Sequence, residues 1–362
     1  MYSFRAVGNF FSKNLGESRV SLAIVLPVLI IGTVFTILFG VGLGPVFVKP
    51  SAVADIIISR IAGVSEPGVY GNWTVLERNI VWGLRLPRVI LGMIVGASLA
   101  VTGVTMQALI RNQLADPFIL GVSSGAAAAA TLGMLFGVFS FLGTYSLSIS
   151  AFFGSAATII FVYIISRVRG RINITQLLLS GVAVSMIADG VTRIITLSAP
   201  NALGLHNASF WMSGSLAGAR WGYLTLPLAV LVLCIVFLMF NYRTLNLLML
   251  GDESAGSLGV NVARTQKMLI LIASLIAGVT ISVSGGIGFV GLMTPHFTRL
   301  LVGSDHRKVL PVAALLGGIL VVWVDVTART IIAPEELPVG ILTAIIGGPL
   351  FIVLLKRRTG GR

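Results

Sequence analysis

Residues 92–107 read GMIVGASLAVTGVTMQ, and this stretch decides the class of fold. No charged residue lies between Arg88 and Arg111, a run about as long as the roughly 20 apolar residues that a bilayer-spanning helix needs. Gly92 and Gly96 form a G-x-x-x-G pattern, which Gly103 continues. Small residues of this kind let helices pack closely in lipid, either within one chain or across a dimer. The stretch predicts a membrane-spanning helix over 88–110.

The rest of the chain has the same character. Its 362 residues are 56% hydrophobic and only 10% charged, with a mean hydropathy of +1.00. A soluble domain carries about 25% charged residues, so this chain has too little polar surface for water. The fold class predicted is an all-α polytopic membrane protein with about ten transmembrane helices, at 20–46, 88–110, 119–139, 146–166, 174–198, 223–241, 266–284, 288–302, 309–332 and 338–355.

The basic residues predict the orientation of these spans. If the N-terminus is cytoplasmic, seventeen of the 25 Lys and Arg residues fall in inside segments and seven in outside segments, with Arg193 inside a span. Cytoplasmic loops of membrane proteins carry such an excess. Both termini are therefore expected in the cytoplasm, and the net charge of +13 reflects these loops rather than nucleic-acid binding. The predicted organisation is a cytoplasmic segment 1–19, a transmembrane domain 20–355 and a basic cytoplasmic tail 356–362.

A second stretch, GGIGFVGLMTPH at 285–296, contains the G-x-G-x-x-G pattern of dinucleotide-binding turns. That pattern needs a preceding strand within a βαβ unit, whereas here it joins two apolar runs. We interpret the glycines as a turn and a close helix contact. The chain also lacks a Gly-Lys dipeptide, so it cannot bind ATP through a P-loop, and no cofactor is expected.

Candidate sites for chemistry are few. The three histidines form no H-E-x-x-H motif, and His296 is either a metal ligand or, as we favour, a polar residue at a helix boundary. Charges within spans are functional candidates. Asp189 and Arg193 lie four residues apart, as do Asp325 and Arg329, so each pair shares a helical face. Each pair is either a proton relay or, as we favour, a mutually neutralised pair.

The loop between the sixth and seventh predicted spans, about 243–265, is polar between long apolar runs and includes LGDESAGSLGVNVARTQ. Asp252 or Ser254 suits the start of a short helix, Leu258 offers an apolar knob and Gly259 suits the end. A helix of this kind fits a cleft on a partner, although an ordinary solvated loop fits the same residues equally well.

Four stretches together resemble the permease subunit of type II bacterial ABC importers for ferric siderophores, haem and cobalamin, the iron-chelate permease family. They are 84–126, which begins LRLPRVILG, 250–260 (LGDESAGSLGV), 288–307 (GFVGLMTPHFTRLLVGSDHR) and 336–355 (ELPVGILTAIIGGPLFIVLL). The resemblance covers nearly the whole chain beyond about residue 20 and implies the type II ABC importer permease fold. One departure is Gln113 in RNQLADPF, where the family commonly has proline.

The resemblance implies roles for particular residues. The 250–260 segment resembles the coupling helix that enters the ATPase, which implies that role for Gly251, Asp252, Glu253, Ala255, Leu258 and Gly259. Arg85, Arg88 and Arg329 match outer-face arginines that pair with acidic residues of a substrate-binding protein, with pairing of Arg329 to Asp325 as the alternative. The fifth span resembles the one that lines the pathway, with a cytoplasmic gate implied at Asn173 and Thr175.

The implied function is that of a permease subunit, not an enzyme, in an ATP-driven importer of the bacterial cytoplasmic (inner) membrane. The implied partners are a cytoplasmic ABC ATPase dimer, a second permease chain, identical or not, and a periplasmic or lipid-anchored substrate-binding protein. A ferric siderophore is the commonest substrate in the family, with haem or cobalamin as alternatives. A proton-coupled secondary transporter, or a membrane enzyme or receptor, would be the rivals from other classes.

Overall fold

The structure, a computed structural model, describes residues 21–63, 73–168 and 171–359. The predicted segment 1–19 lies outside these residues. Every one of the ten predicted spans coincides with a helix: α2 Leu22–Gly42, α5 Leu86–Ile110, α6 Val122–Phe136, α7 Ser146–Ser166, α8 Ile174–Leu197, α10 Thr225–Phe240, α13 Val262–Ser284, α14 Val290–Val302, α15 His306–Ala328 and α16 Val339–Thr359.

Within the described residues, seven helices are long and apolar enough to cross a membrane by themselves. They include the continuous helical run Val75–Ile110, of which α5 is the main part. Of the remaining three, α6 has 15 residues and α14 only 13, while α16 continues through Thr359 into the predicted tail. At a rise of about 1.5 Å per residue, α6 and α14 do not cross a hydrocarbon core of about 30 Å unaided.

Short elements join the spans. They are α3 Pro50–Ile61, α4 Val75–Arg78, the π-helix η1 Asn79–Arg85, the 3-10 turns η2 Pro117–Leu120, η3 Ser140–Tyr145 and η4 Trp221–Tyr223, and the helices α9 Ala202–Met212, α11 Tyr242–Leu248 and α12 Asp252–Ser257. A small antiparallel hairpin pairs β1 Arg167–Val168 with β2 Arg171–Ile172, and Arg167 lies opposite Ile172.

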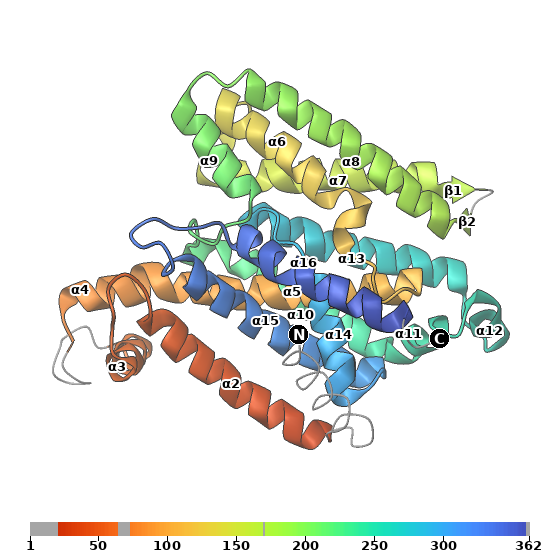
Figure 1. Ribbon diagram of the computed structural model, residues 1–362, viewed down its shortest axis with the longest axis horizontal. Coiled ribbons are helices and arrows are strands. Elements are labelled where there is room, and N and C mark those ends of the chain that lie inside the picture. The colour runs from red at the N-terminus through yellow and green to blue at the C-terminus, as the bar shows by residue number, and fades with distance from the viewer. Residues whose placement is uncertain (1–20, 64–72, 169–170, 360–362) are drawn as a thin grey trace.

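The helices form a bundle around α5, which is buried along almost its whole length. Figure 1 shows α6, α7 and α8 together on one side of the molecule and α2 on the opposite side. The β1–β2 hairpin and α12 lie at one end of the bundle, on the right in this view, and α3 and α4 lie at the other end. The predicted cytoplasmic loops 167–173 and 243–265 therefore come to the same end, as an alternating set of spans requires.

The small residues of α5 are used within the chain. A Cβ atom at Gly96 would lie 2.9 Å from the Cα of Gly318 in α15, and one at Gly92 would lie 3.2 Å from the side chain of Val322. Gly103 meets the backbone of Gly291 in α14. The sequence left open whether the small residues of α5 pack within the chain or across a dimer. In the structure, the glycine face of α5 packs against α14 and α15 of the same chain.

The 285–296 stretch forms the turn between α13 and α14. Gly285 ends α13 with φ at +63° and Phe289 precedes α14 with φ at +66°. In the described part of the chain the only strands are β1 and β2, so no βαβ unit surrounds these glycines. A Cβ at Gly285 would overlap the backbone carbonyl of Trp211, which shows why this turn uses glycine.

Candidate functional site

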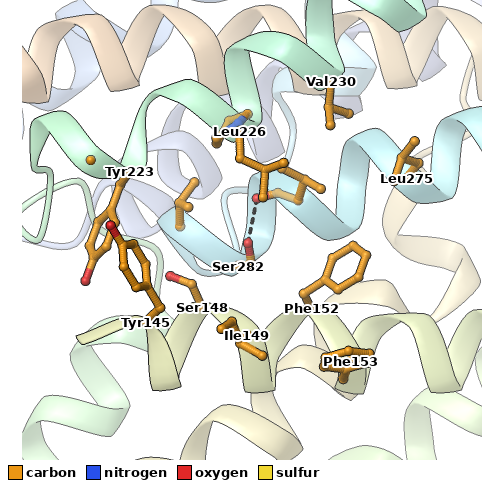
Figure 2. A pocket seen from close by; sticks show the side chains of 14 residues that line it. Tyr145, Ser148, Ile149, Phe152, Phe153, Tyr223, Leu226, Val230, Leu275 and Ser282 are labelled. Carbon is orange, nitrogen blue, oxygen red and sulfur yellow. Dashed lines mark hydrogen bonds between the residues drawn. The ribbon is translucent and has the colours of Figure 1, made fainter. Parts of the chain in front are cut away.

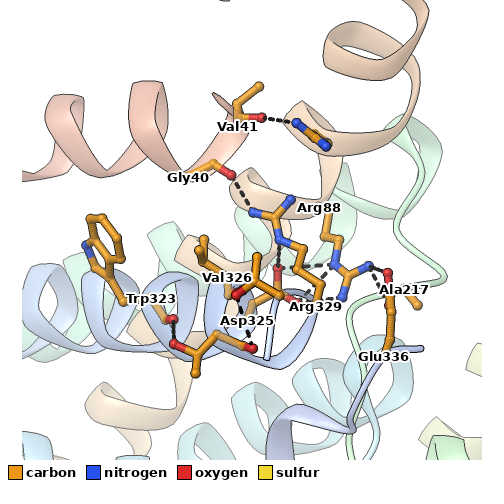
Figure 3. A network of polar contacts seen from close by, with 12 residues as sticks. Gly40, Val41, Arg88, Ala217, Trp323, Asp325, Val326, Arg329 and Glu336 are labelled. Atoms are coloured by element: carbon orange, nitrogen blue, oxygen red, sulfur yellow. Dashed lines mark hydrogen bonds and ion pairs between the residues drawn. The ribbon is translucent and has the colours of Figure 1, made fainter. Parts of the chain in front are cut away.

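Two of the three arginines that were predicted to face outside, Arg88 and Arg329, lie in one buried network (Figure 3). Arg88 of α5 binds Asp325 of α15 at 2.8 Å and Glu336 at 2.8 Å. Arg329, directly after α15, lies 3.5 Å from the same Asp325 carboxylate. Asp325 is therefore shared by two guanidinium groups, one on the next turn of its own helix and one across the bundle.

Further contacts of Arg329 and Arg85 reach the C-terminal end of α2 and, through Arg85 Nη2, the carbonyl of Val46 just beyond it. Arg329 donates to the carbonyl of Gly40. Arg85 donates from Nη1 to the carbonyls of Val41 and Gly42, both at 3.1 Å. The last four carbonyls of a helix have no partner within the helix and carry its negative dipole end. The two arginines therefore cap α2 at its C-terminal end.

Their burial counts against direct contact with a binding protein. Arg85, Arg88 and Arg329 are 7%, 9% and 2% exposed. The pairing of Arg329 with Asp325, the alternative in the sequence analysis, is present. Exposed basic residues at this end of the molecule lie elsewhere, at Lys49, Arg60 and Arg220.

At the opposite end, the predicted coupling segment forms a helix. α12 spans Asp252–Ser257, preceded by Gly251 with φ at +106°. We expected Asp252 or Ser254 to cap this helix, but Gly251 occupies the N-cap position. The Asp252 carboxylate instead binds Arg111 at 3.2 Å and accepts a hydrogen bond from Gln266 at 3.4 Å. Asp252 therefore ties α12 to the end of α5 and to α13.

The two sides of α12 differ in exposure. Ala255 is fully buried, whereas Leu258, which follows the last residue of the helix, is 60% exposed. Glu253 is exposed, and a Cβ at Gly256 would meet nothing within 4 Å. Gly259 then turns the chain with φ at +87°. The segment thus presents one large apolar side chain and a small-residue surface outward.

A second polar cluster anchors the approach to α12. Asn246 of α11 donates to Asp305 at 2.8 Å and accepts the backbone N–H of His306 at 3.0 Å. Burial opposes ionisation of Asp305, but hydrogen bonds from Asn246 and from the Arg307 N–H outweigh it and lower the pKa of this carboxyl. The N-terminus of α15 and α11 are therefore bound together by groups that the sequence analysis did not identify.

A third polar contact joins α5 to α14. Arg299 donates to the side-chain carbonyl of Gln107 at 2.5 Å, and Gln107 is fully buried. Arg299 lies within the predicted span 288–302. Its reach into the bundle could have been suspected from its position within an apolar span, where a charge needs a polar partner.

The predicted gate residues lie at the start of α8. Asn173 caps this helix, since its side chain accepts the Gln176 N–H at 3.0 Å. Thr175, on the first turn, is exposed. The hairpin β1–β2, which the sequence analysis did not predict, immediately precedes them.

The charges within α8 are not paired with one another. Asp189 and Arg193 are both exposed, and within the described residues no ion pair joins them, which differs from the expected mutual neutralisation. A charge near the middle of a span costs about 2.5–3.5 kcal/mol in lipid. This face of α8 therefore requires water or another protein chain rather than hydrocarbon.

No metal centre emerges from the described residues, because no three His, Cys, Asp or Glu side chains come together there. The structural features are instead a multi-span bundle, a buried ionic network at one end and a small helix with an exposed leucine at the other.

Comparisons with known proteins agree with this arrangement. Residues 22–357 match the FecCD transport family. The chain is 40% identical to the hemin transport system permease protein of Yersinia pestis over 79% of its own length and 87% of that protein. It is 42% identical to the cobalamin import system permease protein of Halobacterium salinarum, over 77% of this chain and 74% of that one.

A solved structure is also similar. It is described as an inward-facing conformation of a metal-chelate type ABC transporter, with a TM-score of 0.78, 30% sequence identity and coverage of 92% of this chain and 99% of that one. Since the family match spans almost the whole described bundle, the chain belongs to the FecCD transport family, and it is a multi-pass inner-membrane permease subunit of an ABC importer.

Proposed function

We propose that this permease carries a metal chelate, with a ferric siderophore as the first candidate, and that ATP hydrolysis on a separate ATPase dimer drives it. The single observation that carries the mechanism is the form of α12. It is a short helix bound to α5 and α13 through Asp252, with Leu258 exposed beside it.

The exposed side of α12 is the proposed ATPase contact. Leu258 supplies an apolar anchor, while Gly256 and Gly259 leave room for a partner to approach the backbone. Gly251, Asp252 and Ala255 position the helix from behind, because Asp252 is ion-paired and Ala255 is buried. Glu253, exposed on the first turn, is the proposed polar contact at the rim.

The exposed face of α8 is the proposed wall of the transport pathway. Asp189 and Arg193 on this face need water or a second permease chain, identical or not, opposite them. Asn173 and Thr175 at the cytoplasmic start of α8 are the proposed gate, where movement of the helix N-terminus would open or close the inner end.

At the outer end, the buried arginines are proposed to shape the docking surface for a periplasmic or lipid-anchored binding protein rather than to touch it. Arg85 and Arg329 hold the end of α2, and Arg88 holds Glu336 in the loop after α15. Lys49, Arg60 and Arg220 are the exposed cations available for steering an acidic partner.

The cargo is proposed by likeness. The similar proteins include a hemin permease, a cobalamin permease and a metal-chelate transporter, and all three names denote metal-containing chelates or cofactors. Haem and cobalamin are therefore the alternative substrates to a siderophore. Uptake assays with the cognate binding protein, in which a ferric siderophore, haem and cobalamin compete with one another, distinguish these substrates.

The experiment is ATP-dependent uptake into proteoliposomes that contain the permease, its ATPase and the binding protein. Leu258→Asp should abolish uptake and weaken copurification of the ATPase, because a carboxylate would enter an apolar cleft. Leu203→Asp, at an exposed position of α9 outside the coupling segment, is the matched control and should retain assembly with the ATPase. Full transport by Leu258→Asp would refute the coupling assignment. Uptake driven by a proton gradient with an inactive ATPase would favour a secondary transporter through Asp189.

A further inference from the structure

An apolar groove lies between α7, α10 and α13, and none of the residues that line it has been assigned a role above (Figure 2). Its volume is about 490 Å³, within the range of roughly 300–1,000 Å³ typical of small-ligand sites. Phe152 and Phe153 line it from α7, Leu226 and Val230 from α10, and Leu275 and Val279 from α13.

The groove has the depth of one membrane leaflet. Tyr145 and Tyr223 lie at one end, at the starts of α7 and α10, and Phe153 lies eight residues further along α7. Eight residues of helix span about 12 Å. Half of the hydrocarbon core is about 15 Å. In the predicted topology the tyrosine end is the outer one, so the groove begins at the outer interface and ends near the middle of the bilayer.

The groove wall carries no charge. Helices α7 and α10 contain no Asp, Glu, Lys or Arg along their whole length. Two of the hydroxyl groups that line it are bonded within the chain: the Ser282 hydroxyl donates to the Val279 carbonyl at 2.7 Å, and the Tyr223 hydroxyl donates to the Thr144 carbonyl at 2.7 Å. Unlike the face of α8 with Asp189 and Arg193, this wall suits hydrocarbon.

The outer rim has the chemistry of a headgroup zone. Trp221 packs on Trp82 with ring centroids 4.8 Å apart, and Tyr145 meets Tyr223 edge-on at 5.4 Å. Tryptophan and tyrosine are enriched at the membrane–water interface. Arg220, exposed directly before Trp221, adds a positive charge beside this rim.

We propose that the groove binds one acyl chain of an anionic phospholipid from the outer leaflet, with the lipid phosphate at Arg220. The charge-free wall and the leaflet-deep length favour an acyl chain. The cations at the rim favour an anionic headgroup: Arg220 directly precedes Trp221, and Arg60 lies 5.8 Å from the centroid of the Trp82 ring. The lipid would fill the space between α7, α10 and α13 and contribute to their packing. This inference needs only a membrane-embedded chain and does not depend on the transport mechanism.

The test uses the full-length chain in nanodiscs of phosphatidylcholine with phosphatidylglycerol, where either lipid bears a photoreactive group midway along one acyl chain. Labelling by phosphatidylglycerol should concentrate on the groove segments of α7 and α13. Ser148→Phe, which places a ring in the groove, should remove that labelling. Ile160→Phe, at an exposed position of α7 outside the groove, is the matched control and should not change it.

The rim is tested separately. Arg220→Gln should reduce the preference for phosphatidylglycerol over phosphatidylcholine about fivefold, as expected for the loss of about 1 kcal/mol per basic residue near an anionic surface. Labelling of the groove by phosphatidylcholine should persist in this variant. An unchanged preference would overturn the assignment of the phosphate to Arg220.

Two results would overturn the proposal as a whole. One is uniform labelling of all lipid-exposed helices in the unmodified chain, together with loss of every bound lipid in native mass spectrometry, a measurement that needs no variant to fold. The other is a disulfide between two chains carrying Leu226→Cys, with Cys234→Ala to remove the natural cysteine. That crosslink would show that a second copy, and not a lipid, covers the groove.

Discussion

Arg111, which follows the last turn of α5, binds Asp252, the first residue of α12, at 3.2 Å. The other end of the same helix run carries Arg88, which binds Asp325 at 2.8 Å. The central helix of the bundle therefore has an ion pair at each end, one with the proposed ATPase contact and one within the outer network. Through these two pairs, α5 connects the proposed ATPase contact directly with the network at the opposite end.

Breaking the inner pair should affect coupling more than stability. Arg111 and Asp252 are partly exposed, at 32% and 44%, so loss of the pair should cost only about 0.2–1 kcal/mol of unfolding free energy. Arg111→Gln should nevertheless lower substrate-stimulated ATP hydrolysis in the assembled importer. The double variant Arg111→Asp with Asp252→Arg should restore part of it, and Arg307→Gln, exposed at the same end, should have no effect. Normal stimulation in Arg111→Gln would show that α12 does not need this anchor.

Breaking the outer network should destabilise the fold. Asp325→Asn leaves two buried guanidinium groups short of a counter-charge, and removal of one partner from a buried ion pair costs about 3–5 kcal/mol. Thermal unfolding in detergent measures this change. Glu336→Gln is the control, because its side chain is 33% exposed and its loss should cost less. Equal stability of the two variants would contradict the central position given to Asp325.

Close helix packing predicts the effect of single methyl groups. Gly96→Ala should lower the unfolding free energy by about 1–3 kcal/mol, because the new Cβ would overlap the backbone of Gly317 and Gly318. Gly190→Ala on α8 meets nothing within 4 Å and should leave stability unchanged or raise it by up to about 1 kcal/mol through helix propensity. The same thermal assay compares both, and a tolerated Gly96→Ala would mean that α5 and α15 can separate freely.

Asp116, between α5 and α6, should make stability depend on pH. Burial raises the pKa of this carboxyl to about 6, although a hydrogen bond from the Phe118 N–H opposes the shift. The folded chain then binds more protons than the unfolded chain between about pH 4 and pH 6, so stability falls as pH rises through that window. Asp116→Asn keeps an acceptor for Phe118 and should flatten this dependence. An identical pH profile of melting temperature in the variant would contradict the raised pKa.

The positions of the spans could be predicted from the sequence because lipid imposes a simple rule. A helix that must satisfy its own backbone in hydrocarbon appears as an uninterrupted apolar run. Prediction of α7 over 146–166 agrees with the observed Ser146–Ser166 for this reason. The start of α6 was misplaced, because Pro117–Leu120 is as apolar as a span but forms a separate 3-10 turn before Gly121.

The environment of the outer arginines could not be predicted in the same way. The position of Arg85 and Arg88 along the chain predicted that they lie on the outer side. It did not predict whether their side chains contact water or protein. Arg88 binds Asp325, which is 237 residues away in the sequence. Arg85 binds backbone carbonyls of α2, which no side-chain pattern in the sequence reveals. Only the i, i+4 spacing of Asp325 and Arg329 was visible, and that pairing is present. Likewise α9 was missed, because its 11 residues carry no periodic pattern distinct from the neighbouring loop.

The contact between Gly96 and Gly317 has a mechanical consequence. The backbones of α5 and α15 are in direct contact there, and those of α5 and α14 are in direct contact at Gly103 and Gly291, so no side chains lie between them that could rearrange to allow rotation or sliding. Helices α5, α14 and α15 should therefore move together as one rigid unit. Gly125 of α6 and Gly154 of α7 are in the same direct backbone contact. Any alternation between outward and inward openings is therefore expected between these two closely packed groups of helices rather than within either of them.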